Sequence, residues 1–381
     1  MSCSRGSVRA SLANSENGII VGVMGRPEPI LSPPRPRRDH GFHPIRVAEV
    51  VQETADAVSL VLEVPTELAD VFAYEPGQFC NLRVAVDGEP QMRCYSMSSA
   101  PVMDEAMQVT VKRVPGGIVS NWIVDRVRDG DTVELSPPTG FFQLTDTAGP
   151  FVAFAAGSGI TPVLSLVKTA LVTTSRVVRL HYANRDAQSV IFDTTLSELE
   201  TRYPDRLTVV RTFDVEHGLL TADAVTAFAD ESARDGEFYL CGPGPYMEVV
   251  EQGLGILRVE AERIRIERFA QTDLRMGAPP AAPEPAQATR VTIELDGRTD
   301  VTDHRAGTTI LQTARQMGMA PPFSCESGSC ATCMARIVEG SVSMFVNNAL
   351  TPEEVEEGWI LTCQSVPTSA AVRVVYGFEE D

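Results

Sequence analysis

Four cysteines near the C-terminal end of the chain have the spacing of metal ligands. Cys325, Cys330 and Cys333 are separated by four and then by two residues, and Cys363 follows in the segment WILTCQS. Three thiolates from one tight loop and a fourth from a later strand are the arrangement that holds a 2Fe–2S cluster. A zinc site usually shows two separated C-x2-C pairs, whereas this segment has one. The spacing therefore predicts an iron–sulfur cluster, a carrier of single electrons.

The segment before these cysteines predicts the element that positions them. Residues 291–318 read VTIELDGRTDVTDHRAGTTILQTARQMG, which predicts a β-hairpin followed by a helix. This is how a plant-type ferredoxin domain begins. Within the cysteine loop, Gly328 and Ser329 permit a sharp turn that can direct backbone N–H groups at the cluster sulfurs.

Two glycine-containing turns upstream have the composition of a nucleotide site. The turn GSGITP, residues 157–162, lies between the apolar strand FVAFAA and a helical segment, and CGPG, residues 241–244, follows a second apolar strand. Such turns let the backbone approach a pyrophosphate at a helix N-terminus. The first turn lacks the third glycine of the dinucleotide fingerprint, and Cys241 alone could be a small buried apolar residue. The pattern by itself therefore leaves a purely structural role open.

A third group of residues has the chemistry that a flavin requires. Tyr95 could pack against an isoalloxazine ring, Ser96 could donate a hydrogen bond near N5, and Arg93 could neutralise a phosphate. Downstream, Ser120 and Asn121 stand at the start of a predicted helix, where the N-terminus favours anions. Each of these residues also has an ordinary structural explanation, such as helix capping or strand packing.

The elements that must position these residues divide the chain into domains. Residues 45–145 alternate apolar and polar positions between turns, which predicts an antiparallel β-barrel interrupted by one helix near SNWIVDRV. After Gly149, apolar strands alternate with helical segments, which predicts a parallel α/β sheet. The predicted fold is thus multidomain, ending in an α+β β-grasp ferredoxin domain. The expected boundaries are a flexible N-terminal tail at 1–44, the barrel at 45–146, the parallel α/β domain at 147–272, an Ala/Pro linker at 273–289 and a 2Fe–2S ferredoxin domain at 290–381; the family resemblance described below implies that the barrel binds FAD and the α/β domain NAD(P).

The composition of the chain limits which kinds of partner and which cellular compartment we expect. The formal net charge of −19 argues against nucleic acid as the main partner, because phosphates would be repelled. No apolar run approaches the roughly 18 residues that a membrane span needs. The remaining cysteines show no pairing rhythm and no secretory signal is evident, so we expect a reducing, cytoplasmic location.

Longer motifs carry a resemblance to a known family. RCYSMSSAP, VTVKRVPGGIVSNW and PPTGFFQL resemble the FAD-binding barrel of the ferredoxin–NADP reductase superfamily, and AAGSGITP and YLCGPGPYM resemble its pyridine-nucleotide domain. With a ferredoxin at the C-terminal end, the order from about residue 45 onward resembles reductase components of bacterial oxygenases. The phrase VNNALTPEEVEEGWILTCQS adds a resemblance to reductases of 3-ketosteroid 9α-hydroxylases.

The resemblance implies roles for individual residues. It puts Ser96 near the flavin N5, Cys241 beside the nicotinamide and Phe269, from the motif RIERFAQ, over the flavin face that the nicotinamide must reach. The SNW form of the phosphate loop favours FAD over FMN, and oxygenase reductases mostly use NADH. The implied cofactor-binding residues are Arg93, Tyr95, Ser96, Lys112, Gly117, Ser120, Asn121, Gly157, Gly159, Thr161, Gly242 and Pro243.

The three predicted domains imply one electron path. NADH delivers two electrons together as hydride, a flavin releases them singly, and an iron–sulfur cluster carries them outward. The expected acceptor is the terminal component of a Rieske-type oxygenase, here one acting on a steroid. The alternative is the reductase subunit of a phenylacetyl-CoA epoxidase, which has a di-iron partner. A redox-sensing module is a third, less favoured interpretation.

Overall fold

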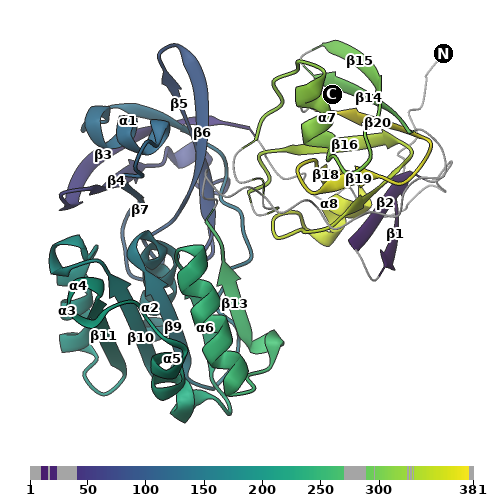
Figure 1. Cartoon of the computed structure of the whole chain (residues 1–381). Coiled ribbons are helices and arrows are strands. Elements are labelled where there is room, and N and C mark those ends of the chain that lie inside the picture. The colour runs from purple at the N-terminus through teal and green to yellow at the C-terminus, as the bar shows by residue number, and fades with distance from the viewer. Residues whose placement is uncertain are drawn as a thin grey trace. The chain divides into compact units, whose positions relative to one another are not determined.

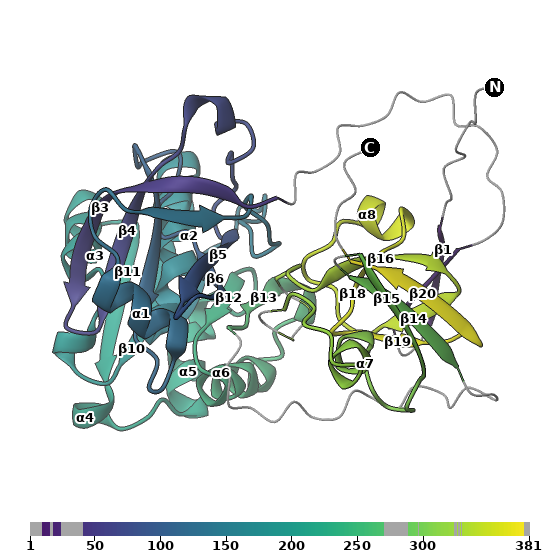
Figure 2. The same cartoon turned by 90° about the horizontal axis from the view of Figure 1, so that it is seen from above.

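The computed structural model describes residues 10–15, 18–23, 41–269, 289–295, 297–323, 326, 328 and 330–376. The chain forms two compact units (Figure 1; Figure 2). The central unit comprises residues 41–269, and the terminal unit comprises the segments on either side, up to residue 40 and from residue 270 onward. Among the described helices, none is both long and apolar enough to cross a membrane.

The first half of the central unit is an antiparallel barrel. Its six-stranded sheet has the order β6-β5-β8-β3-β4-β7, and an isolated bridge between Met97 and Val109 joins the two outer strands. Alternate side chains of a strand point to the same face, so Met107, Val109 and Val111 of one strand, β7, all point into the barrel core. The elements are β3 (His43–Thr54), β4 (Ala57–Glu63), η1 (Thr66–Leu68), β5 (Phe79–Val86), β6 (Glu89–Ser96), β7 (Met107–Lys112), α1 (Ile118–Arg126) and β8 (Thr132–Leu135).

The second half of the central unit is a parallel sheet covered on both faces. The strand order is β11-β10-β9-β12-β13. Phe151 and Ala153 of the middle strand belong to the core on one face, and Val152 and Phe154 belong to the core on the other. Burial on both faces explains why this strand is apolar at every position. The elements are β9 (Phe151–Ala156), η2 (Gly157–Gly159), α2 (Ile160–Thr173), β10 (Val178–Asn184), η3 (Ala187–Ser189), α3 (Asp193–Arg202), β11 (Leu207–Phe213), α4 (Asp214–His217), α5 (Ala222–Ala229), η4 (Asp230–Ser232), β12 (Glu237–Cys241), α6 (Gly244–Ile256), η5 (Ala261–Arg263) and β13 (Ile264–Glu267).

The terminal unit is built on a mixed sheet with one main helix. The strand order is β15-β14-β20-β16-β18, with β14 parallel to β20 and the other neighbours antiparallel. Ile310 and Leu311 of the helix pack into the same core as Val291 and Ile293 of the sheet. The elements are β14 (Arg290–Leu295), β15 (Arg298–Asp303), α7 (Ile310–Gln316), β16 (Met334–Glu339), β17 (Ser341–Met344), α8 (Pro352–Glu356), β18 (Trp359–Leu361), β19 (Ser365–Pro367) and β20 (Ala371–Val375).

A second sheet of the terminal unit includes the N-terminal residues. β1 (Ala10–Ser15) and β2 (Gly18–Val23) form a hairpin that continues into β17 and β19, in the order β1-β2-β17-β19 (Figure 1). The prediction of a flexible tail is wrong for these two strands. Their partner β17 lies more than 300 residues away along the chain, so no local pattern could reveal the pairing. Most of the predicted Ala/Pro linker, residues 273–288, lies outside the described residues.

Candidate functional site

The predicted flavin residues lie at the end of an edge strand of the barrel. Residues 93–96 form the last part of β6, opposite β5 in the register Leu82↔Arg93 and Phe79↔Ser96. Just beyond them, the Met97 N–H donates to the Gln78 carbonyl at 3.0 Å. Ser96 is buried, and burial raises the pKa of Tyr95, so that its phenol stays neutral. This strand end is therefore a fixed, uncharged surface next to the Arg93 cation.

The start of α1 has the features of an anion site. A Cβ added to Gly117 would lie 2.7 Å from the Ser120 hydroxyl oxygen and 3.0 Å from the Val114 Cβ, so a larger residue here would displace the surrounding loop. The Ser120 hydroxyl accepts the Val114 N–H at 3.1 Å, and the Asn121 amide donates to the Gly117 carbonyl at 2.7 Å. These side chains thus hold the loop, and none of the first-turn residues of this fully described helix is acidic. The positive end of α1 fits a flavin pyrophosphate.

The first nucleotide turn, residues 157–162, packs closely against the second, residues 241–244. η2 and the start of α2 follow β9 directly, and a Cβ on Gly159 would stand only 2.1 Å from the Cys241 carbonyl oxygen. Gly157 has a φ of +53°, a conformation that favours glycine. The Thr161 hydroxyl donates to the Ser158 carbonyl at 3.1 Å, which closes the turn. The bare backbone of this turn fits the close approach of a dinucleotide.

The second nucleotide turn begins where β12 ends. β9 and β12 are parallel neighbours, so their carboxyl ends bring Cys241 and Gly242 beside the first turn. Pro243 occupies the N-cap position of α6, just before the first helical residue. Cys241 has no exposed surface, and burial raises the pKa of its thiol, which therefore stays uncharged. Phe269, just after β13, packs against the apolar cluster that contains Cys241.

One barrel residue reaches the first nucleotide turn. The ammonium nitrogen of Lys112 lies 3.8 Å from where a Cβ on Gly157 would be, and 4.0 Å from a carboxylate oxygen of Asp56. A cation beside a glycine turn at a helix start complements a phosphate. Thus Lys112, Gly157, Gly159, Thr161 and Gly242 converge in one place. Arg93, Tyr95 and Ser96 lie together at the end of β6.

Sequence patterns missed the contacts that join the barrel to the parallel sheet. The Lys168 ammonium of α2 pairs with Asp104 at 2.8 and 3.0 Å, and both side chains are largely shielded from water. One helical turn earlier, the Ser165 hydroxyl donates to the Ser99 carbonyl at 2.6 Å. The only sequence signal was a lysine in an otherwise apolar helix. These contacts, made from the second and third turns of α2, hold the helix in place relative to the barrel.

Three of the predicted cluster ligands are buried on neighbouring segments. Cys330 and Cys333 are each 2% exposed and Cys363 is 4% exposed. Cys333 comes just before β16 and Cys363 just after β18, and these strands pair with Met334 opposite Leu361. Cys325 lies outside the described residues. Within the described part of the chain, no three candidate ligands are gathered as a metal site. The fit to a 2Fe–2S cluster therefore rests on the chemistry of the donors, three cysteine thiols in the loop and a fourth at Cys363.

Hydrogen bonds tie the cysteine loop to the segments around it. The Thr362 hydroxyl donates to the Cys333 carbonyl at 2.7 Å, and the Gln364 amide donates to the Glu326 carbonyl at 2.7 Å. Gly328 has a φ of +78°, and its carbonyl accepts the Asn348 N–H at 2.9 Å. The loop is therefore curled and anchored on both sides, as a set of converging thiolates requires.

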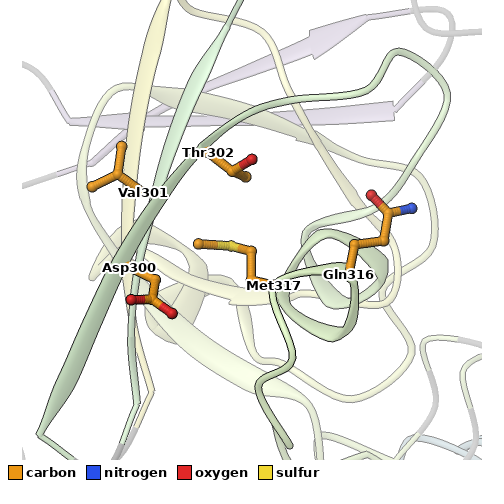
Figure 3. Close-up of a pocket in the computed structure, with 5 residues that line it drawn as sticks. All are labelled: Asp300, Val301, Thr302, Gln316 and Met317. Carbon is orange, nitrogen blue, oxygen red and sulfur yellow. The ribbon is translucent and has the colours of Figure 1, made fainter.

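A pocket elsewhere on the terminal unit belongs to neither site. It has a volume of about 300 Å³ and lies between β15 and the end of α7, where Met317 stands opposite Thr302 (Figure 3). Its lining residues are Asp300, Val301, Thr302, Gln316 and Met317. None of the predicted cofactor residues lines it.

A barrel with an anion site, a parallel sheet with two nucleotide turns and a cysteine loop together define an electron-transfer flavoprotein reductase. Family models agree with this class. An oxidoreductase FAD-binding domain matches residues 44–144, an oxidoreductase NAD-binding domain matches 154–252, and a 2Fe–2S iron–sulfur cluster binding domain matches 293–368.

Whole-chain relatives narrow the class further. The chain is 40% identical over 341 residues to the ferredoxin reductase component of 3-ketosteroid-9-alpha-monooxygenase from Rhodococcus rhodochrous, covering 87% of this chain and 96% of that protein. It is 33% identical to a subunit of 1,2-phenylacetyl-CoA epoxidase from Escherichia coli, covering 87% and 97%. Among solved structures, phthalate dioxygenase reductase matches with a TM-score of 0.57 and 25% identity, covering 88% and 98%.

The chain belongs to the family of oxygenase reductase components that carry FAD-binding, NAD-binding and 2Fe–2S domains. It is an oxidoreductase that uses NADH, FAD and a 2Fe–2S cluster. The predicted multidomain fold, with an antiparallel barrel, a parallel sheet and a ferredoxin domain, is confirmed.

Proposed function

We propose that the chain passes electrons from NADH to the terminal component of a Rieske-type oxygenase that acts on a steroid. The observation that carries the proposal is the 40% identity to a 3-ketosteroid-9-alpha-monooxygenase reductase component, which extends over 96% of that protein. The identity therefore includes all three cofactor regions. The proposal includes a cytoplasmic location, because grouped cysteines of metal-ligand spacing, with no pairing rhythm among the others, are typical of a reducing compartment.

In this proposal the central unit holds the two-electron donor and the flavin in contact. Bound FAD supplies the conversion from hydride to single electrons. Ser96 donates a hydrogen bond near the flavin N5, and Lys112 with the turn at Gly157 binds the nucleotide pyrophosphate. Cys241 lies beside the nicotinamide. Because burial keeps its thiol neutral, no thiolate charge opposes the hydride there. Phe269 covers the flavin face and excludes water until the nicotinamide replaces it.

In the terminal unit, Cys325, Cys330, Cys333 and Cys363 hold the 2Fe–2S cluster. The amide of Gln364 lies 3.7 Å from the Cys363 sulfur. Donors near ligand sulfurs stabilise the reduced state of a cluster. Gln364 therefore helps the cluster to accept an electron.

Reconstitution tests the proposal. The purified chain, NADH, a 3-ketosteroid 9α-monooxygenase terminal component and its steroid should together yield hydroxylated steroid. A Cys333→Ser variant should give no product while still oxidising NADH with ferricyanide, an acceptor that does not require the cluster. If the unaltered chain oxidises NADH with ferricyanide but supports no Rieske oxygenase, the proposed partner class is wrong.

A second candidate is the di-iron epoxidase system. The observation that favours it is 33% identity to the phenylacetyl-CoA epoxidase relative over 97% of that protein. In parallel assays at equal reductase concentration, turnover with the catalytic components of a phenylacetyl-CoA epoxidase should be much slower than turnover with the steroid oxygenase. The reverse order would select the epoxidase.

A further inference from the structure

The N-terminal hairpin is the described part of the chain that the family leaves unexplained. The FAD-binding model begins only at residue 44. Yet β1 and β2 are paired along their full length, from Ala10↔Val23 to Ser15↔Gly18. β2 then pairs antiparallel with β17, from Ser341↔Gly22 to Met344↔Ile19. The hairpin thus adds two strands to a ribbon that would otherwise consist of β17 and β19 alone.

The hairpin is part of the core of the terminal unit. Val21 has no exposed surface and belongs to the same apolar cluster as Val342 and Met344 of β17, and Ile19 packs against that cluster. Figure 1 shows the hairpin, in purple, beside the yellow-green elements of this unit. A two-stranded ribbon is marginal in water, whereas three or more strands over an apolar face are stable.

The segment that follows β17 is hydrogen-bonded to the cysteine loop and to the residue after Cys363. After β17 ends at Met344, the Phe345 N–H donates to the Gln364 carbonyl at 3.0 Å, next to Cys363. Three residues later, the Asn348 N–H donates to the Gly328 carbonyl inside the cysteine loop. A hairpin that fixes β17 therefore also fixes the segment on which the loop rests.

The position of the hairpin in the chain adds a second consequence. The chain leaves the terminal unit after β2, forms the whole central unit and returns at β14. The chain therefore passes between the two units twice, between residues 40 and 41 and between residues 269 and 270. Two connections restrict a tethered partner to a smaller volume than one, and so raise its effective concentration.

We propose that residues 10–23 are a resident strand pair that completes the terminal unit and joins it to the central unit by a second connection. The occupant of the β17 edge is the chain's own N-terminal hairpin. The inference that this connection speeds reduction of the cluster depends on the electron path proposed above. The strand pairing itself does not.

Hydrogen exchange tests the pairing in the full holoprotein. A variant lacking residues 1–23 and a Val21→Asp variant should each show at least about tenfold faster exchange of the β17 amides. The temperature at which the cluster absorbance is lost should fall by about 5 °C or more. Val301→Asp is the matched control, because Val301 is 53% exposed on the outer strand β15. Unchanged β17 exchange in both test variants would overturn the proposal.

Cutting the second connection tests its role. A protease site placed within residues 24–40 should be cleaved after purification, with the uncleaved protein as control. In anaerobic stopped-flow mixing with NADH, flavin reduction should be unchanged, whereas cluster reduction should slow at least about twofold. Equal cluster reduction before and after cleavage would overturn the role of the second connection. Failure of the cleaved and uncleaved proteins alike to reduce any oxygenase would instead count against the proposed function.

Discussion

The nucleotide turns of the central unit and the cysteine loop of the terminal unit are both tightly built, but by different means. The nucleotide turns depend on missing side chains, since an added Cβ would lie 2.1 Å from the Cys241 carbonyl oxygen at Gly159 and 3.0 Å from the side chains of Ala156 and Tyr246 at Gly242. The cysteine loop depends on particular side chains, since Thr362 and Gln364 hold its backbone. It also contains Glu326 and Ala331 at positive φ, a conformation uncommon for residues with a side chain.

The difference shows how each site tolerates change. A turn of bare backbone at the end of a parallel sheet is disrupted when a side-chain atom is added, because the surrounding strands are packed on both faces and cannot move away. A loop held by side-chain hydrogen bonds is disrupted when a cluster ligand or one of the hydrogen-bonding side chains is removed. Mutations should therefore separate nucleotide function from cluster function, and each prediction below can strengthen or break that contrast.

The largest expected effect is at the cluster. Cys333→Ser should abolish the 2Fe–2S absorbance and reduce electron delivery to an oxygenase more than about 100-fold, because hydroxyl oxygen is a poor cluster ligand. Flavin reduction by NADH should remain. Cys94→Ser, which changes a thiol in the barrel, should keep the cluster. A cluster retained in Cys333→Ser would remove Cys333 from the ligand set.

The next effect is at the first nucleotide turn. Gly159→Ala puts a methyl group 2.1 Å from the Cys241 carbonyl oxygen. It should lower the free energy of unfolding by about 2–3 kcal/mol and reduce kcat/KM for NADH at least about tenfold, while cluster absorbance persists. Gly255→Ala, near the exposed end of α6, is the control, since no described atom lies within 4 Å of its added Cβ. Normal NADH kinetics in Gly159→Ala would show that the turn can open without cost.

The next effect is on the pH dependence of stability, through a histidine that is buried in the parallel sheet. Burial lowers the pKa of His181 to about 4 from its ordinary 6.5. The stabilising contribution of the neutral ring is therefore present above pH 6.5 and is lost as the pH falls toward 4. Between pH 7 and pH 5 the loss should be about 2 kcal/mol of unfolding free energy, measured by denaturant titration of the central unit.

His181→Gln should reduce this pH dependence by that amount, whereas His217→Gln, at an exposed position, should leave it unchanged. Identical pH dependence in both variants would mean that water reaches His181 in the folded sheet.

The smallest effect concerns the contact between barrel and sheet. A double-mutant cycle with Lys168→Met and Asp104→Asn should give a coupling energy of about 1 kcal/mol, because the side chains are only 11% and 27% exposed. The exposed pair Arg46 and Glu63 should show coupling near zero. Equal coupling in the two pairs would indicate that shielding contributes nothing to this contact.

Local patterns were enough to predict the fold class and the iron–sulfur cluster, whereas FAD and NADH were predicted from the resemblance to a known family. Apolar alternation with period two predicted the barrel, and apolar strands followed by helices predicted the parallel sheet, because both patterns are set by residues close in sequence. The spacing of Cys325, Cys330 and Cys333 likewise predicts the cluster within one loop. The roles of the individual flavin and nucleotide residues remain predictions.

Long-range contacts were beyond local patterns. Lys168 and Asp104 are 64 residues apart, and each alone resembles an ordinary surface charge. Ser120 and Asn121 were expected to face a phosphate, yet their side chains hydrogen-bond the loop before α1. The apolar run at residues 18–23 gave no sign of its partner, because strand pairing depends on what the distant β17 leaves open.

The position of the hairpin also sets an order for synthesis. β2 emerges from the ribosome before the whole central unit, whereas its partner β17 is made more than 300 residues later. The central unit can fold as soon as residue 269 has emerged, since domains generally fold as units in the order they are made. The apolar strand that contains Val21 lacks its partner β17 throughout that interval, so the nascent chain exposes it until residues 341–344 have emerged.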